Sequence, residues 1–267
     1  MIFDTHAHYD DTAFDEDRKE ILNSLKTGGI DLVLTVASSL NSTEKVLQLI
    51  EEYPFLFGAV GVHPESIDEL DETKFVWLQK VIRDRKKKVV AIGEIGLDYY
   101  WNISNREIQK QWFSRQLELA KEEDLPVIIH SREAAKDTFD IIQLACKNAE
   151  KQGKRLTGVI HCFSYSIEMA REFLKLGFYL GIGGTVTFKN AKKLLEVVEE
   201  IPLERIVLET DCPYLAPVPN RGKRNSSLNL PFVAEKIAQL KKVTSKEVME
   251  ITKKNGMSLF RIPIELL

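Results

Sequence analysis

Every histidine in this 267-residue sequence stands at or just beyond the end of a short apolar run. These residues are His6, His8, His63, His130 and His161. Two acids, Glu94 and Asp211, follow apolar runs in the same way. Histidine and carboxylate side chains are common ligands of zinc and similar divalent ions. Their placement at strand ends predicts a metal-dependent hydrolase whose site lies at the mouth of a barrel.

The number of candidate ligands predicts two bound cations. His6 and His8 are two residues apart on a strand, so their imidazoles point the same way and can share one ion. The full set is His6, His8, Glu94, His130, His161 and Asp211. This is too many for a single catalytic zinc, which takes three protein ligands and keeps one position open. We therefore expect Glu94 to bridge two divalent cations, whose identity (magnesium, manganese or zinc) stays open.

Eight apolar runs predict the strands that position these residues. They begin near residues 1, 31, 57, 89, 126, 157, 178 and 205, and amphipathic stretches of helix length follow them. One such stretch is 105–123, and a capping box at 244–247 predicts a last helix running toward Leu259. Eight units without a linker predict one (β/α)8 TIM barrel domain over residues 1–267. A doubly wound fold is the alternative, but no G-x-G-x-x-G turn follows an early strand.

Composition limits the partners and the compartment. The net charge of −3 argues against a globally basic nucleic-acid binder, so contact with a polyanion must come from a local patch or bound cations. Three cysteines suggest no disulfide framework, and neither a signal peptide nor a run of ~20 apolar residues is seen. We expect a cytoplasmic protein without membrane contact or an obligate protein partner.

Three residues join Glu94 in the predicted catalytic set. Asp211 is the best candidate for accepting the proton of an attacking water, because it is a ligand that also faces the nucleophile. Glu209 points the same way one layer deeper, where it either orients a ligand or pairs with a core cation such as Arg132. His63 faces the mouth and either contacts a phosphate, stabilises a leaving group or has a structural role.

Cations and aromatic residues near the mouth are candidates for substrate binding. Arg221, Lys223 and Arg224 follow the last strand, where they either clamp phosphate oxygens or form a solvated charge run. Tyr99, with Tyr100 and Trp101, either stacks on bases or packs its loop onto the barrel. The residues predicted to bind substrate are Arg132, Arg221, Lys223, Arg224, Asn225 and Tyr99.

Seven motifs, in this order, resemble the signatures of the TatD family of metal-dependent deoxyribonucleases, within the amidohydrolase superfamily. They are DTHAH (4–8), GVHP (61–64), GEIGLDYY (93–100), HSR (130–132), HCFS (161–164), ETDCP (209–213) and RGKRN (221–225). The similarity runs from residue 2 to about residue 261. Two places depart from the family pattern, residues 226–231 and Tyr165, and both are expected beside the substrate groove.

The resemblance implies a distorted TIM barrel and two metal sites. One ion would be held by His6, His8, Glu94 and Asp211, and the other by Glu94, His130 and His161. It also implies hydrolysis of phosphodiester bonds in DNA, often as a 3′→5′ exonuclease, with nucleic acid as the partner. The alternatives are a D-aminoacyl-tRNA deacylase-like esterase or another amidohydrolase on the same binuclear site, and a non-catalytic binding barrel, which would be expected to lack a ligand.

Overall fold

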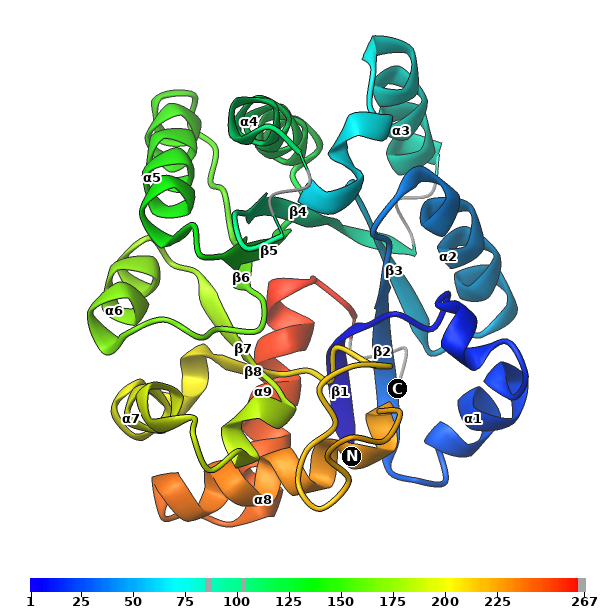
Figure 1. Cartoon of the computed structure of the whole chain (residues 1–267), viewed down its shortest axis with the longest axis vertical. Helices are drawn as coiled ribbons and strands as arrows, with labels where there is room; N and C mark the ends of the chain where they lie inside the picture. Colours follow the sequence, from blue (N-terminus) through cyan, green and yellow to red (C-terminus); the bar gives the residue numbers. More distant parts are fainter. Residues whose placement is uncertain (85–87, 102–103, 264–267) are drawn as a thin grey trace.

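The computed structural model describes residues 1–84, 88–101 and 104–263. Within them, eight parallel strands pair in chain order inside a ring of helices (Figure 1). The strands are β1 (Ile2–Ala7), β2 (Ile30–Val36), β3 (Leu56–Val60), β4 (Val89–Asp98), β5 (Val127–Arg132), β6 (Gly158–Ile160), β7 (Tyr179–Ile182) and β8 (Ile206–Leu208). The helices are α1 (Arg18–Leu25), α2 (Leu40–Glu52), α3 (Glu72–Asp84), α4 (Arg106–Glu123), α5 (Ala135–Lys151), α6 (Ile167–Lys175), α7 (Lys192–Glu200), α8 (Leu230–Lys241) and α9 (Ser245–Leu259). The predicted (β/α)8 TIM barrel is confirmed.

The apolar pattern located the strands closely, since each strand begins within one residue of its predicted position. The predicted capping box also opens α9. The Oγ1 of Thr244 accepts a hydrogen bond from the backbone N–H of Glu247 (3.2 Å), and the Glu247 carboxylate accepts one from the backbone of Thr244 (2.8 Å). These reciprocal bonds satisfy two backbone donors that the helix start would otherwise leave unpaired.

The barrel is irregular where its first and last strands meet. Among the described residues, a single bridge, between Ala7 and Cys212, joins the ends of β1 and β8. Next to it, the backbone N–H of Asp211 donates to the carbonyl of His6 (2.9 Å), and that of His8 donates to the carbonyl of Cys212 (2.8 Å). The seam of the barrel is therefore closed by the same residues that supply candidate ligands.

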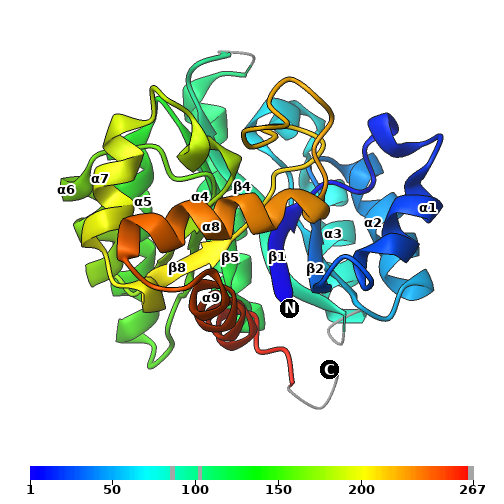
Figure 2. The same cartoon turned by 90° about the horizontal axis from the view of Figure 1, so that it is seen from below.

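Helix α9 closes the end of the barrel at which the strands begin. It lies beneath the strands, on the side where β1 begins (Figure 2). The ring of Phe260, just after α9, meets that of Phe3 edge-on at a centroid distance of 6.0 Å. Gly256 allows this approach, since an added Cβ would lie 2.7 Å from the Phe3 ring. The open end is therefore the mouth formed by the carboxyl ends of the strands.

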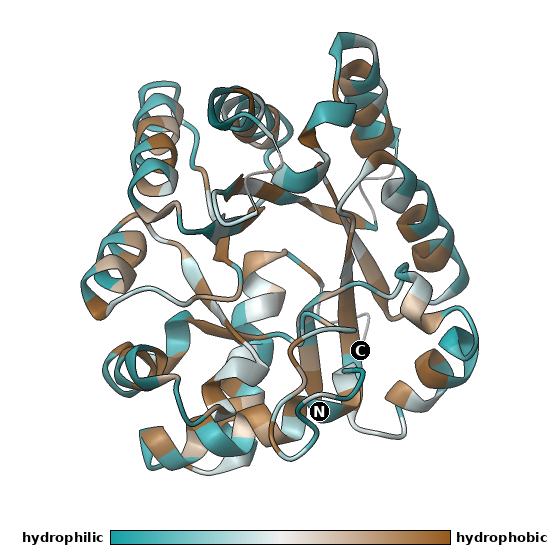
Figure 3. Ribbon diagram, viewed as in Figure 1, coloured by the Kyte–Doolittle hydropathy of each residue, from teal (hydrophilic) through white to brown (hydrophobic). Residues whose placement is uncertain are grey.

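Hydropathy follows the layers of the fold. The strands are mostly hydrophobic, and the surrounding helices alternate hydrophobic and hydrophilic residues (Figure 3). Burying one helix face against the sheet removes apolar surface from water, at about 25 cal/mol per Å². Within the described ranges, no helix combines the length and the apolar character that crossing a membrane would require.

Candidate metal centre

A hollow of about 530 Å³ opens at the mouth of the barrel. Its walls include five of the six predicted metal ligands: His8, Glu94, His130, His161 and Asp211. The sixth, His6, is fully buried and is not among the residues that line the hollow. Residues in or just after β1, β4, β5, β6 and β8 thus come together from distant parts of the sequence in one site, as expected for a TIM barrel.

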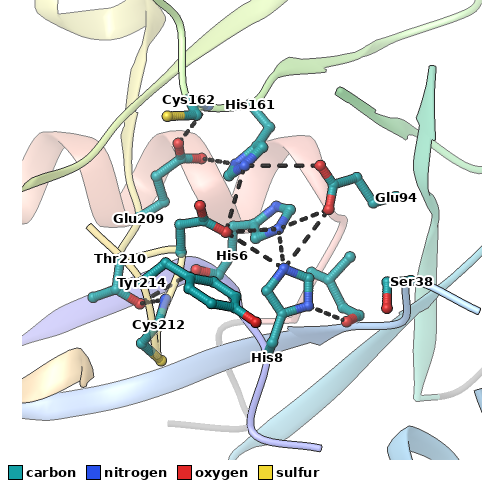
Figure 4. Close-up of polar contacts among 12 residues, drawn as sticks. His6, His8, Ser38, Glu94, His161, Cys162, Glu209, Thr210, Cys212 and Tyr214 are labelled. Carbon is teal, nitrogen blue, oxygen red and sulfur yellow. Dashed lines mark hydrogen bonds and ion pairs between the residues drawn. The ribbon is translucent and has the colours of Figure 1, made fainter. Parts of the chain in front are cut away.

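The carboxylate of Glu94 contacts several imidazoles of this cluster, and Figure 4 shows its contacts with His6, His8 and His161. Its Oε1 is 2.8 Å from Nδ1 of His130, and its Oε2 is 3.4 Å from Nε2 of His6 and 3.7 Å from Nε2 of His8. The Oδ1 of Asp211 is 3.4 Å from Nε2 of His8. One carboxylate within reach of several imidazoles is the arrangement that a bridging ligand requires.

Among the described residues, the possible ligand atoms form four groups, each within 4.8 Å. The groups are His6, His8 and Glu94; His6, His161 and Asp211; His63, Glu94 and His130; and His161, Cys162 and Glu209. The first matches part of a set implied by the family resemblance. The other groups differ from the second implied set, which joins His161 to Glu94 and His130. The ring of His161 stacks on that of His6, with centroids 3.5 Å apart, and lies near Asp211. His63 instead lies beside Glu94 and His130.

Hydrogen bonds behind the cluster determine which imidazole nitrogen faces it. The carbonyl of Val36, which can only accept, lies 2.8 Å from Nδ1 of His8, so Nδ1 carries a proton and Nε2 faces the cluster. Burial opposes protonation, but the Asp211 carboxylate helps raise the pKa of His8 to about 9. For His161, Glu209 and Asp211 overcome burial in the same way and raise the pKa to about 10. A cation that binds either Nε2 would displace a proton.

His63 is held in the opposite tautomer. Its Nδ1 accepts a hydrogen bond from the backbone N–H of Glu65 at 3.2 Å, so the neutral ring carries its proton on Nε2. Burial, together with the neighbouring His130, lowers the pKa of His63 to about 3. The ring is therefore neutral near pH 7. Its Nε2, 3.7 Å from Oε1 of Glu94, presents a hydrogen-bond donor to the cluster.

Glu209 supports His161 from behind. Its Oε2 lies 3.1 Å from Nδ1 of His161, and its Oε1 accepts a hydrogen bond from the backbone N–H of Cys162 at 2.6 Å. Gly181 leaves room for this carboxylate, because an added Cβ would collide with it. Of the two alternatives read from the sequence, the position agrees with orientation of a ligand and not with an Arg132 ion pair.

A buried polar network lies under Asp211, whose backbone adopts a left-handed φ of 57°. The neighbouring Thr210 donates hydrogen bonds to Asp4 from its backbone N–H (3.0 Å) and its hydroxyl (2.7 Å). Ser227 donates a further bond of 2.6 Å to the same carboxylate. Left-handed backbone at a residue other than glycine is strained and needs such support.

Side chains at the two departures from the family pattern make contacts within the protein. Ser227, within residues 226–231, is fully buried and belongs to the network under Asp211, so its side chain does not face a groove. The hydroxyl of Tyr165 lies 2.8 Å from Oγ of Ser131 and is likewise used within the protein. Both residues therefore support the loops around the site.

The predicted phosphate clamp is not gathered at the hollow. Arg224 forms a two-pronged ion pair with Asp17, including a 2.8 Å contact, and Arg221 lies over the ring of Phe188. Lys223 is exposed, but it is not among the described residues that line the hollow. Assigning Asn225 to substrate binding is corrected, because its amide is fully buried and donates to the carbonyl of Thr210.

Two of the residues considered for substrate contact, Arg132 and Trp101, do lie at the mouth and line the hollow. Tyr99 has a different position: its hydroxyl donates to Asp137 (2.7 Å) and Arg106 covers its ring. Tyr99 therefore packs the loop onto the barrel, which is the structural alternative that the sequence left open for this residue.

Two acids near the site escaped sequence reasoning. Asp98 lies 3.1 Å from Nε2 of His130, and Asp10 lines the hollow. A signal was present in both cases. Asp98 is four residues after Glu94 on the same strand, and Asp10 is two residues after His8. Side chains an even number of residues apart on an extended chain point to the same side, so each acid could be expected on the side of a predicted ligand.

The donor set fits divalent cations. Imidazoles and carboxylates converge at one point, and Nδ1 of His6 is buried without a hydrogen-bond partner among the described residues. Burial also lowers the pKa of His6, which keeps the ring in the neutral, metal-binding form. A TIM barrel with such a cluster at its mouth is the arrangement of a metal-dependent hydrolase.

Comparison with known proteins gives the family. Residues 3–261 match the family described as TatD related DNase, and the chain belongs to the TatD family. The metal-dependent hydrolase YabD of Bacillus subtilis is 44% identical over 262 residues, covering 98% of this chain and all of YabD. YcfH of Escherichia coli K12, also named a metal-dependent hydrolase, is 34% identical, covering 98% of this chain and 96% of YcfH.

Solved structures agree with this assignment. The crystal structure of YjjV, a TatD homologue from E. coli, matches with a TM-score of 0.89 and 32% identity over 98% of both chains. A TatD family hydrolase from Entamoeba histolytica matches with a TM-score of 0.84 and 26% identity over 97% of both. The phosphotriesterase homology protein of E. coli shares the fold at a TM-score of 0.66 and 17% identity, covering 97% of this chain and 98% of that one.

Proposed function

We propose that this chain is a deoxyribonuclease that hydrolyses phosphodiester bonds in DNA, as a 3′→5′ exonuclease using two divalent cations. The observation that carries the proposal is the position of Glu94, whose two oxygens face different imidazoles inside an open hollow. Membership of a family described as TatD related DNase supports the choice of substrate.

In the proposed site, His6, His8, Glu94 and Asp211 would hold one cation, and Glu94, His130 and His161 would hold the other, since Nε2 of His161 lies 3.8 Å from Oε1 of Glu94. Such ions lower the pKa of water and neutralise charge on phosphoryl oxygens. Burial would raise the pKa of Asp211, but His161 and His8 outweigh it and hold the pKa below its ordinary value. The carboxylate is thus ionised near pH 7 and can accept the proton of the attacking water. His63 can donate its Nε2–H to a phosphoryl or leaving oxygen.

A second candidate is an esterase that acts on aminoacyl esters. Asp10, Asp11 and Glu65 line the hollow, and Arg132 is the one lysine or arginine among the described residues of its lining. Carboxylates repel a phosphate but attract the ammonium group of an aminoacyl substrate. This acidic wall is the specific observation in favour of the esterase.

The two candidates are separated by a direct assay. The protein is stripped with a chelator, reloaded separately with magnesium, manganese or zinc, and incubated with 5′-labelled single- and double-stranded DNA. A ladder shortening by single nucleotides supports the proposal, whereas defined internal fragments would indicate an endonuclease. No DNA cleavage with any of these metals, together with hydrolysis of D-aminoacyl-tRNA, would reject the nuclease in favour of the esterase. The stripped protein and the Asp211→Asn variant serve as controls.

A further inference from the structure

The loop after β4 presents two aromatic side chains that the proposed metal chemistry does not use. Tyr100 is 50% exposed and Trp101 is 55% exposed. Their rings meet edge-on, with centroids 5.0 Å apart. Trp101 lines the same hollow as the metal ligands. Aromatic surface beside a reactive centre can be covered by a ligand, and every nucleobase has a flat face that suits it.

Arg132 adds a cation to this aromatic surface. Its guanidinium carbon lies 3.9 Å from the centroid of the Tyr100 ring and 5.5 Å from that of Trp101. Stacking on the rings fixes the plane of the guanidinium. Unlike Arg224, which is paired with Asp17, Arg132 forms no ion pair with any carboxylate among the described residues, so its donors remain available at the hollow.

Asp98 fixes this surface relative to the metal centre. Its Oδ1 accepts hydrogen bonds from the backbone N–H groups of Tyr100 (2.9 Å) and Trp101 (3.1 Å). Its Oδ2 lies 3.1 Å from Nε2 of His130. One buried carboxylate therefore contacts both the aromatic loop and a candidate ligand. A surface held in this way loses little conformational entropy when it binds.

We propose that Trp101, Tyr100 and Arg132 form a nucleotide platform. One nucleobase next to the scissile phosphate stacks on Trp101, and the Arg132 guanidinium binds an adjacent phosphate oxygen. The inference rests on the proposed nuclease function. Stacking on a ring face requires an unpaired base, so the platform recognises a single-stranded end. It recognises the face of the base and therefore tolerates any sequence.

The test removes the base and the ring separately. Substrates are single-stranded oligonucleotides that carry one abasic site, at the terminal or at the penultimate position. Wild-type protein should lose roughly 5- to 150-fold in kcat/KM at one of these positions, the range expected for one stacked base. The Trp101→Ala variant should be slow on the intact strand and lose little more with the abasic one. Trp101→Phe, which keeps a ring, should recover part of the preference. Leu144→Ala, at an exposed apolar residue of α5, is the matched control and should behave as wild type.

A binding measurement gives a readout independent of turnover. The chain has three tryptophans, and Trp112 is buried. A deoxythymidine oligonucleotide with phosphorothioate linkages should quench the intrinsic fluorescence of the metal-loaded protein, and most of this quenching should be absent in Trp101→Phe. If wild type cleaves DNA but treats intact and abasic strands alike, the platform is wrong while the nuclease function stands. If no oligonucleotide is cleaved, the proposed function itself fails.

Discussion

The Oε2 atom of Glu209 lies 3.1 Å from Nδ1 of His161, on the opposite edge of the ring from Nε2. A carboxylate in this position makes the imidazole a stronger ligand and fixes its orientation. Glu209 is nearly fully buried, so this contact is isolated from solvent. The strength of metal binding at His161 should therefore depend on a residue that need not touch the metal.

Replacing Glu209 by Gln should weaken metal binding by roughly 10- to 100-fold while the barrel stays folded, because the negative charge behind His161 is lost. Competition with a chromophoric chelator at fixed pH measures the affinity. Gly181→Ala should have a similar effect, since the new Cβ would push the Glu209 carboxylate aside. Glu204→Gln, at an exposed glutamate, is the matched control. Unchanged affinity in both test variants would contradict the supporting role of Glu209.

Replacing Asp211 by Asn should reduce turnover by ~10²- to 10⁴-fold, because the side chain can no longer accept a proton. Asn tolerates the left-handed backbone at this position, so the fold should survive. Turnover and metal content are measured on the same sample, with circular dichroism as a check of folding. Near-normal turnover at full metal occupancy would show that Asp211 is not the proton acceptor.

Arg132, and not the run after β8, should dominate the salt dependence of DNA binding. Each lost phosphate contact on a single strand reduces the slope of log K against log salt by ~0.7. We expect this change in Arg132→Ala and little change in the Arg221→Ala/Lys223→Ala double variant, because Arg132 lines the hollow. Fluorescence anisotropy at several salt concentrations measures the slopes. A smaller slope in the double variant, with an unchanged slope in Arg132→Ala, would instead support the phosphate clamp predicted from the sequence.

Cys146, on α5, should make the free energy of unfolding decrease as the pH rises above 9. Burial raises the pKa of its thiol from 9.0 to about 11. The folded state therefore holds this proton more tightly than the unfolded state, and the contribution of the thiol to stability is complete below pH 9 and falls between about pH 9 and 11. The unfolding free energy of wild type minus that of Cys146→Ala should fall by at most about 1.4 kcal/mol per pH unit in this window. Urea unfolding at several pH values measures it, and a pH-independent difference would contradict the raised pKa.

Much of the fold and of the metal cluster was predictable, because both depend on local patterns. A strand buried on both faces is a continuous apolar run, which is why the start of β4 at Val89 could be placed to the residue. The carboxyl ends of parallel strands meet at one mouth, so His6 and His161 could be expected near each other despite their separation in sequence.

The partners of the surrounding residues were not predictable, because they depend on contacts between distant segments. Arg224 and Asp17 are 207 residues apart, and nothing near either one indicates their ion pair. Asn225 looks like an exposed polar residue after a cationic run, but the loop turns its amide inward to Thr210. The tautomer of His63 depends on the backbone N–H of Glu65, whose direction depends on the local backbone conformation.

Because residues from both ends of the sequence meet at the seam of the barrel, the proposed ligand set is complete only when synthesis of the chain is nearly finished. His6 and His8 leave the ribosome early, but the bridge at Cys212 and the carboxylate of Asp211 become available only after some two hundred further residues. A nascent or truncated chain that lacks β8 carries the first histidines without the partners that complete the proposed ligand set. In the proposed site, ion loading would therefore follow completion of the barrel, and bound ions would mark a finished molecule.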